Sequence, residues 1–325
     1  MPGRTVSWTV LGLGVVLALS AIAEFWVGLK AEHVSDLVRP EMTDSGLARH
    51  RADFALMRGV LVGLDQEVIP AIATGLNTTP ARLRATIDAN YPAVAKLLAE
   101  QGQIIPFAES SLANLERQQQ RFENADSYPI SSWPGYSFAF VDFAFALVII
   151  GAGVELVVRG RWRIATLSAL IAVCALLIVL PLSLRAPAKT SDAQTVLDSL
   201  NPTEAVVART EASIATANAA AAELEQRLLP DLAKSLGVSR AEFDTAIARQ
   251  SPSTGAGLKE LPAALARYND RLAIRVGGAE DIRALKKLPI ARLAWFDPAF
   301  GAVLLVIVGG AIVMLRRERD GGRPS

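Results

Sequence analysis

Four long runs of apolar residues stand out from an otherwise polar chain, and each is bounded by charged residues. They cover residues 8–29, 136–158, 164–184 and 298–315. A helix needs roughly 20 apolar residues to cross the hydrocarbon core of a bilayer, so each run is long enough to be a membrane span. The pattern therefore predicts an all-α integral membrane protein with four transmembrane helices.

The short segments outside the predicted spans are basic, and this bias predicts the orientation of the chain. The turn at residues 159–163 carries three arginines: Arg159, Arg161 and Arg163. Because basic residues in short segments stay in the cytoplasm, both termini and the turn are predicted to be cytoplasmic in a multi-pass plasma-membrane (inner-membrane) protein. The three arginines are expected to contact anionic lipid at the inner leaflet, and the long segments 30–135 and 185–297 are expected to be extracytoplasmic loops.

The first apolar run also allows a second interpretation, a cleaved signal peptide. Ala21-Ile22-Ala23 resembles a small-residue cleavage site, and Arg4 precedes the apolar core. A retained span is favoured, because the corresponding run of the second half is internal and cannot be removed. Either outcome exports the segment that follows.

The two halves of the chain have the same organisation. Residues 1–158 and residues 164–325 each contain a span, a long outer loop and a second span. Five residues of the first loop recur in the same order in the second: Pro70, Leu76, Ala81, Ile87 and Pro92 correspond to Pro230, Leu236, Ala241, Ile247 and Pro252. Because both copies have the same membrane sense, the sequence predicts a tandem duplication of the parallel type.

Each outer loop is predicted to open with a long helix whose apolar residues recur every seven positions. The two sets are Leu47, Phe54, Leu61 and Val68 in the first loop and Val207, Ile214, Ala221 and Leu228 in the second. Such spacing is typical of a coiled-coil seam. The sequence therefore predicts an interaction surface along each of these helices.

Prolines interrupt both long helices and should limit their length. Pro70 and Pro230 lie inside the apolar pattern, where a missing N–H and a ring clash should kink or end the helix. Thr79 and Ser239 are expected to cap the helices that follow. The remainder of each loop is expected to return in shorter helices, including residues 106–124 and 261–276.

Composition excludes several classes of function. The chain has 33 basic and 32 acidic residues and a net charge of +1, so nothing attracts it to nucleic acid. Cys174 is the only cysteine and there are two histidines, His33 and His50, so neither a disulfide nor a Cys/His metal site is expected. No nucleophile elbow, P-loop, dinucleotide fingerprint or zinc-protease motif occurs. We therefore expect no enzymatic activity, no catalytic residue, no metal and no cofactor.

Two carboxylates inside the predicted spans are the main candidate site. Glu24 interrupts the first span and Asp142 the second, and neither recurs in the second half. A charge inside a membrane costs at least about 2.5 kcal/mol on insertion scales, so such residues usually face a partner, a cavity or each other. One interpretation is a site for a cation or a proton, or a contact for a basic residue or a lipid head group on a partner subunit. The other is that both side chains reach the outer interface or are protonated within the helical bundle.

The features together predict a non-enzymatic membrane protein whose extracytoplasmic helical domain is an interaction or scaffolding module of a bacterial cell-envelope assembly. Its expected partners are the lipid bilayer and either another protein or a second copy, bound through the outer helices. One alternative is an accessory subunit of a lipid or envelope transport complex. Another is an extracytoplasmic sensor without its own output domain, because paired spans around a helical outer domain resemble, in architecture only, bacterial chemoreceptors and sensor kinases.

Overall fold

The computed structural model describes residues 2–129, 133–159, 163–200 and 203–321, and these ranges contain helices and short connections but no strand. Four helices are long and apolar enough to cross a membrane: Thr5–Met42, Ser137–Arg159, Ile164–Ser183 and Ile290–Val313. The predicted all-α class is confirmed, and the four apolar runs predicted as spans lie in these four candidate membrane-spanning helices. The chain has the character of a membrane protein.

The chain divides into two compact units, and each unit draws on both halves of the sequence. Unit 1 comprises Met1–Asp36, Gln120–Leu200 and Asp281–Ser325, and unit 2 comprises Leu37–Gln119 and Asn201–Glu280. Unit 1 therefore holds the four apolar helices, and unit 2 holds most of the two long loops.

Unit 1 contains α1 (Pro2–Met42) as far as Asp36, together with five further helices of the described chain. These are α6 (Ser137–Arg159), α7 (Ile164–Ser183), α8 (Ala186–Leu200), α13 (Ile290–Leu293) and α14 (Phe296–Gly321). A buried core joins the four apolar helices, with fully buried members such as Leu17 of α1, Ile149 of α6, Leu177 of α7 and Leu304 of α14. Many large apolar side chains of the same helices, including Trp26 and Val306, point outward. Such an apolar exterior is expected of helices surrounded by lipid.

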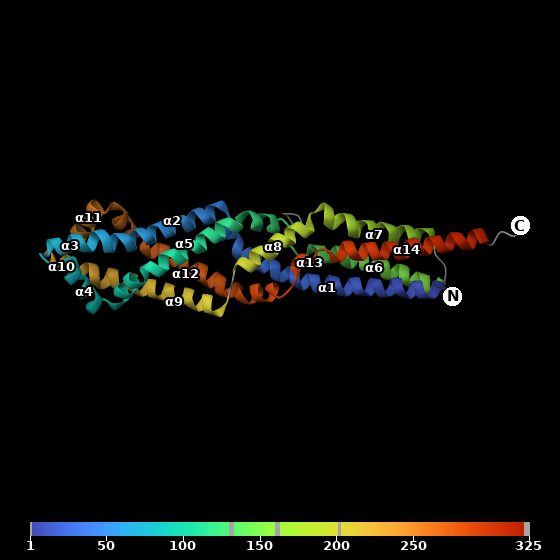
Figure 1. Ribbon diagram of the computed structural model, residues 1–325, viewed down its shortest axis with the longest axis horizontal. Coiled ribbons are helices and arrows are strands. Elements are labelled where there is room, and N and C mark those ends of the chain that lie inside the picture. Colours follow the sequence, from blue (N-terminus) through green and yellow to red (C-terminus); the bar gives the residue numbers. More distant parts are fainter. Residues whose placement is uncertain (1, 130–132, 160–162, 201–202, 322–325) are drawn as a thin grey trace. The chain divides into compact units, whose positions relative to one another are not determined.

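Unit 2 contains two series of helices of matching length (Figure 1). The first is α2 (Asp44–Gly63), η1 (Leu64–Val68), α3 (Ile69–Gly75), α4 (Pro80–Asn90) and α5 (Pro92–Asp126). The second is α9 (Glu204–Glu223), η2 (Leu224–Leu228), α10 (Leu229–Ser235), α11 (Arg240–Gln250) and α12 (Pro252–Lys286). Every member of the second series begins at the same offset from its counterpart, since the starting positions pair as 204 with 44, 224 with 64, 229 with 69, 240 with 80 and 252 with 92.

The predicted interruptions at Pro70 and Pro230 take the form of π-helical segments. The five-residue segments η1 and η2 precede the prolines, and helix continues through each proline to Gly75 and Ser235. A π-turn moves the hydrogen bond of the chain from the i−4 to the i−5 carbonyl, which absorbs the mismatch around a residue that has no N–H. The bend comes later, and α4 turns by 104° relative to the helical segment that ends at Gly75.

The caps predicted for the following helices are confirmed. The Thr79 hydroxyl accepts the N–H of Arg82, and Ser239 forms a reciprocal capping box with Glu242. Asn77 and Gly237, two residues before these caps, both have positive φ, at 51° and 71°. The expectation of short returning helices was wrong, because α5 and α12 each run for 35 residues and contain Pro106 and Pro262 as internal residues.

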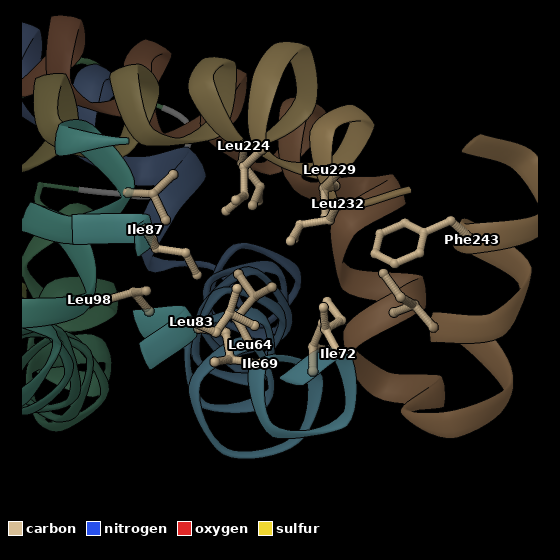
Figure 2. Packing of buried hydrophobic residues seen from close by; sticks show 14 of the residues in the cluster. Leu64, Ile69, Ile72, Leu83, Ile87, Leu98, Leu224, Leu229, Leu232 and Phe243 are labelled. Atoms are coloured by element: carbon tan, nitrogen blue, oxygen red, sulfur yellow. The ribbon is translucent and has the colours of Figure 1, made fainter. Parts of the chain in front are cut away.

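Aliphatic side chains from both series form the core of unit 2. Figure 2 shows Leu64, Ile69 and Ile72 of the first series turned toward the same interior as Leu224, Leu229 and Leu232 of the second. Phe243 of α11 and Ile87 of α4 also belong to this core and are almost fully buried. Neither loop alone supplies this core, so the two loops fold together.

Candidate functional site

The structure brings the two predicted carboxylates together with a third that the sequence did not indicate. One carboxylate oxygen of each of Glu24, Asp142 and Asp297 lies within 4.8 Å of the other two. The three residues belong to α1, α6 and α14, so three different apolar helices of unit 1 contribute. Asp142 is 1 % exposed and Asp297 is 7 % exposed, whereas Glu24 is half-buried.

Two oxygens of this carboxylate cluster have no donor. Within the described part of the chain, neither Oδ2 of Asp142 nor Oδ1 of Asp297 has a hydrogen-bond partner, although both atoms are buried. Glu24 accepts a long hydrogen bond of 3.4 Å from the Ser20 hydroxyl one helical turn earlier. No ion pair joins any of the three acids to a basic side chain among the residues described, so their charge is not balanced by the protein.

The acids affect the pKa of Tyr128, which lies just outside the predicted spans. Burial raises the pKa of its hydroxyl well above the usual value, and the nearby charges of Asp297, Glu24 and Asp142 raise it further. Its ring packs against Phe138 with centroids 5.8 Å apart. A half-buried phenol whose pKa is raised therefore lies near the carboxylate cluster.

Asp297 escaped prediction because of where the fourth span was taken to begin. The apolar run starts at Pro298, which left Asp297 as the last residue of a loop. In the structure α14 begins at Phe296, so the aspartate lies in its first turn and faces the interior. A carboxylate next to a span boundary was the available signal, but only packing could show which way it points.

Arg159 and Arg163, at the two ends of the basic turn, both pair with Glu155. Glu155 of α6 pairs with Arg159 (Nη1 to Oε1, 2.7 Å) and with Arg163 (Nε to Oε1, 3.4 Å). It also accepts a hydrogen bond of 2.6 Å from Thr166 in the first turn of α7. Arg161 lies outside the described residues. These contacts link the end of α6 to the start of α7, so these residues contribute to the packing of the two helices.

Unit 2 contains a partly open cavity of about 200 Å³. Its walls come from four helices, α2, α5, α9 and α12, together with the adjoining π-helical residues Leu64 and Leu224. The predicted heptad positions Phe54, Leu61, Ile214 and Ala221 are among the lining residues. The seams predicted from the sequence therefore face an apolar space within the bundle.

The cavity exists partly because one wall has short side chains. Ala217, Ala220 and Ala221 of α9 line it, together with larger residues such as Met57 of α2 and Leu97 of α5. A methyl group cannot fill the space that a leucine would occupy, so volume remains open. Most of the other lining residues are also apolar, and the polar ones are His50, Arg58, Ser111, Thr210, Ser213, Tyr268 and Arg271.

A buried charge network adjoins the cavity. Arg271 contacts Glu41 (Nε to Oε2, 3.2 Å) and Asp53 (Nη2 to Oδ2, 2.9 Å), and its guanidinium lies 5.2 Å from the ring centre of Tyr268. Arg267 also binds Asp53, through Nε at 3.1 Å from Oδ1, and this hydrogen bond raises the pKa of Arg267. His50 lies against the carboxylate of Glu41.

One donor of this network faces no acceptor. Nη1 of Arg271 is buried and has no hydrogen-bond partner in the described chain. Both Arg271 and His50 line the cavity. The cavity thus has an apolar body and a polar wall with a spare N–H group. The sequence did not indicate this network, because its members lie on three helices, α1, α2 and α12, that are far apart along the chain.

No protein-family model matches this chain, and no curated protein or solved structure is significantly similar to it.

Proposed function

We propose that this protein is a non-enzymatic, multi-pass membrane protein that binds an apolar, lipid-like molecule in unit 2 on behalf of a cell-envelope assembly. The observation that carries the proposal is the cavity between α2, α5, α9 and α12. Of the functions expected from the sequence, an interaction module and an accessory subunit for lipid or envelope transport both agree with such a cavity.

The size and lining of the cavity favour an apolar occupant. Apolar cavities of about 150 Å³ exclude water and admit benzene-sized molecules, and this one measures about 200 Å³. A segment of an acyl or isoprenoid chain would bury its methylene groups there, at about 0.8 kcal/mol for each. Water would gain few hydrogen bonds from the alanine, leucine and phenylalanine side chains around it.

The polar wall favours a ligand that has a hydrogen-bond acceptor. The free Nη1 of Arg271 can donate to a carbonyl, carboxylate or phosphate oxygen, and Tyr268 and His50 lie on the same lining. A buried donor without an acceptor costs about 1–3 kcal/mol, which a ligand oxygen would recover. We therefore assign an amphipathic ligand whose polar group lies against Arg271.

We also propose an orientation of the chain in the membrane. Both termini and the turn around Arg159 and Arg163 are cytoplasmic, and unit 2 is extracytoplasmic, where it would meet envelope lipids. The arginine bias of the short segments supports this orientation. A lipid-binding domain on that side of the membrane agrees with a role in transport or assembly of envelope material.

We also propose that the chain arose by tandem duplication. The constant offset between paired helices and the two π-helical segments support it. Equivalent hydrogen bonds support it too, because Arg58 binds Glu109 and Asn218 binds Asn269, and these two pairs are related by the same offset as the helices. The parallel repeat explains why the cavity has two walls from each half.

The binding proposal is tested by photolabelling the full chain in nanodiscs with a fatty acid that carries a diazirine in its tail. Mapping of the labelled peptides distinguishes the cavity from the surrounding bilayer. We expect adducts on lining residues of α2 and α5, such as Met57 and Leu112. The variant Ala217→Phe, which fills the cavity from α9, should reduce these adducts at least about tenfold.

The control is Ala219→Phe, two residues along the same helix, where the side chain is exposed and lies outside the cavity. It should label like the wild-type chain. Adducts confined to the apolar helices of unit 1, or labelling unchanged by Ala217→Phe, would contradict the proposal.

Copurification from native membranes separates the alternatives. A permease or ATPase as the dominant partner would favour an accessory transport subunit. A ligand-dependent rise in the stability of unit 2 without such a partner would favour a sensor. Capture of other envelope proteins or of a second copy through the outer helices would favour a scaffold.

A further inference from the structure

We propose that Glu24, Asp142 and Asp297 form a binding site for a hard divalent cation of the Mg²⁺, Ca²⁺ and Mn²⁺ class within unit 1. This site is separate from the cavity of unit 2 and does not depend on the function proposed for it. It rests on the convergence of the three side chains and on the buried oxygens that have no donor.

The three carboxylates concentrate negative charge at one place in unit 1. Three carboxylates with oxygens within 4.8 Å of one another carry up to three negative charges in a largely buried position. In an environment of low dielectric constant such a group needs compensation by protons or by a cation. The described chain provides no basic side chain in contact with them, so the compensation must come from outside the protein.

Two buried oxygens of the cluster receive no hydrogen bond from the described residues. Asp142 is 1 % exposed and Asp297 is 7 % exposed, yet Oδ2 of the first and Oδ1 of the second receive no hydrogen bond in the described residues. A buried acceptor without a donor is destabilising, and more so when the group is charged. A cation bound between the three helices would satisfy these atoms directly.

The chemistry of the ligands selects the class of cation. All three groups are carboxylates, which suit Mg²⁺, Ca²⁺ and Mn²⁺, whereas zinc and copper favour nitrogen and sulfur. Cys174 of α7 is not part of the cluster, and no histidine is either. Three carboxylates leave coordination positions for water, as is usual for Mg²⁺ and Mn²⁺.

A bound cation would also have a structural effect. Glu24 belongs to the first apolar helix, Asp142 to the second and Asp297 to the fourth, so the ion would tie together helices from both halves of the chain. Without it, mutual repulsion of the three carboxylates would separate α1, α6 and α14 or force protonation. Cation binding should therefore stabilise unit 1.

The test is a titration of the full-length protein in phosphatidylcholine nanodiscs with Mn²⁺, followed by electron paramagnetic resonance. A zwitterionic lipid is used because anionic head groups would bind the ion themselves. We expect one tight site per chain, competition by Mg²⁺ or Ca²⁺, and a rise in the thermal midpoint on addition of Mn²⁺ that a chelator reverses.

Two variants remove ligands singly. Asp142→Asn and Glu24→Gln should each weaken Mn²⁺ binding by at least about tenfold and abolish the thermal shift. Both reduce the number of charges in an apolar bundle, so both should insert, and the half-buried Glu24 gives a readout if Asp142→Asn does not fold. Asp244→Asn, at an exposed carboxylate of α11 that pairs with Arg240, is the matched control and should bind like the wild type.

The proposal is overturned if the wild-type chain binds no Mn²⁺ above the level of Asp142→Asn, because protons then neutralise the cluster. Binding that Glu24→Gln and Asp244→Asn affect equally would also overturn it. Failure of Ala217→Phe to change lipid labelling would bear only on the cavity, so the two proposals are tested independently.

Discussion

At the scale of single residues, the buried network of unit 2 combines acidic residues of the first half with arginines of the second. The first half contributes Glu41 and Asp53 to the buried network of unit 2, and the second contributes Arg267 and Arg271. The positions equivalent to the two arginines in the first half hold Phe107 and Ser111. Divergence after a duplication would therefore have created complementary charges inside the same bundle.

Asp53 is the residue on which this network should depend most. Its side chain is 4 % exposed and binds both Arg267 and Arg271. Replacement by alanine leaves Arg271 buried with one partner fewer, and breaking a buried pair in this way costs about 3–5 kcal/mol. We expect Asp53→Ala to lower the free energy of unfolding by that amount, measured by chemical denaturation of the detergent-solubilised chain.

The comparison for this prediction is Glu109→Ala. Glu109 pairs with Arg58 between α2 and α5, but its side chain is 46 % exposed. Exposed ion pairs contribute about 1 kcal/mol or less, so this variant should be nearly neutral. Equal losses for both variants would mean that burial does not control the strength of these pairs.

At the scale of secondary structure, glycine determines how closely the first two apolar helices pack. The position of a Cβ atom on Gly153 of α6 would lie 2.8 Å from the backbone of Leu11 in α1. Gly14 of α1 makes a similar approach to Ile150 of α6. Gly151, which lies away from the contact face, has nothing within 4 Å. Small residues permit this close approach between helices in membranes.

Replacement of Gly153 and of Gly151 by alanine should have opposite effects on the stability of the protein. Gly153→Ala should destabilise the protein by about 1–3 kcal/mol, because backbone atoms of α1 would have to move. Gly151→Ala should be neutral or stabilising by up to about 1 kcal/mol, since alanine is the better helix former and has open space. Thermal unfolding in detergent measures both. A loss for Gly151→Ala as large as that for Gly153→Ala would refute close packing of α1 on α6.

At the scale of the whole molecule, the proposed topology predicts which residues can be labelled from outside the cell. The chain has one cysteine, the buried Cys174, and its replacement by alanine gives a background without thiols. In that background, Ser110→Cys and Ser235→Cys probe the two loops at exposed positions, and Ile164→Cys probes the start of α7 next to the basic turn.

A membrane-impermeant maleimide should label the two loop cysteines in intact cells or spheroplasts and should label Ile164→Cys only after permeabilisation. The physical reason is the retention of the arginine-rich turn in the cytoplasm. Replacing Arg159, Arg161 and Arg163 together by glutamine should weaken this pattern or reduce the yield. Labelling of Ile164→Cys in intact cells would reverse the proposed orientation.

The sequence by itself determined the helical class, the four helices that could span a membrane and the positions of the helix caps and of the prolines. Those features depend on local periodicity, on the length of apolar runs and on the chemistry of single residues such as Ser239, all of which are visible within a short stretch of chain. It also singled out Glu24 and Asp142, because a carboxylate in an apolar run is conspicuous wherever the helix packs.

Only the tertiary structure decided what these residues face. Asp297 joins the carboxylate cluster because α14 begins before its apolar run, at Phe296, and turns that side chain inward. The cavity is lined by alanines of α9 together with residues of α2 and α5. Arg271 of α12 meets Asp53 of α2, although the two helices belong to different halves of the chain. Such contacts follow from the rotation and register of packed helices, which are set by the sum of many side-chain contacts and leave no signature in any one segment.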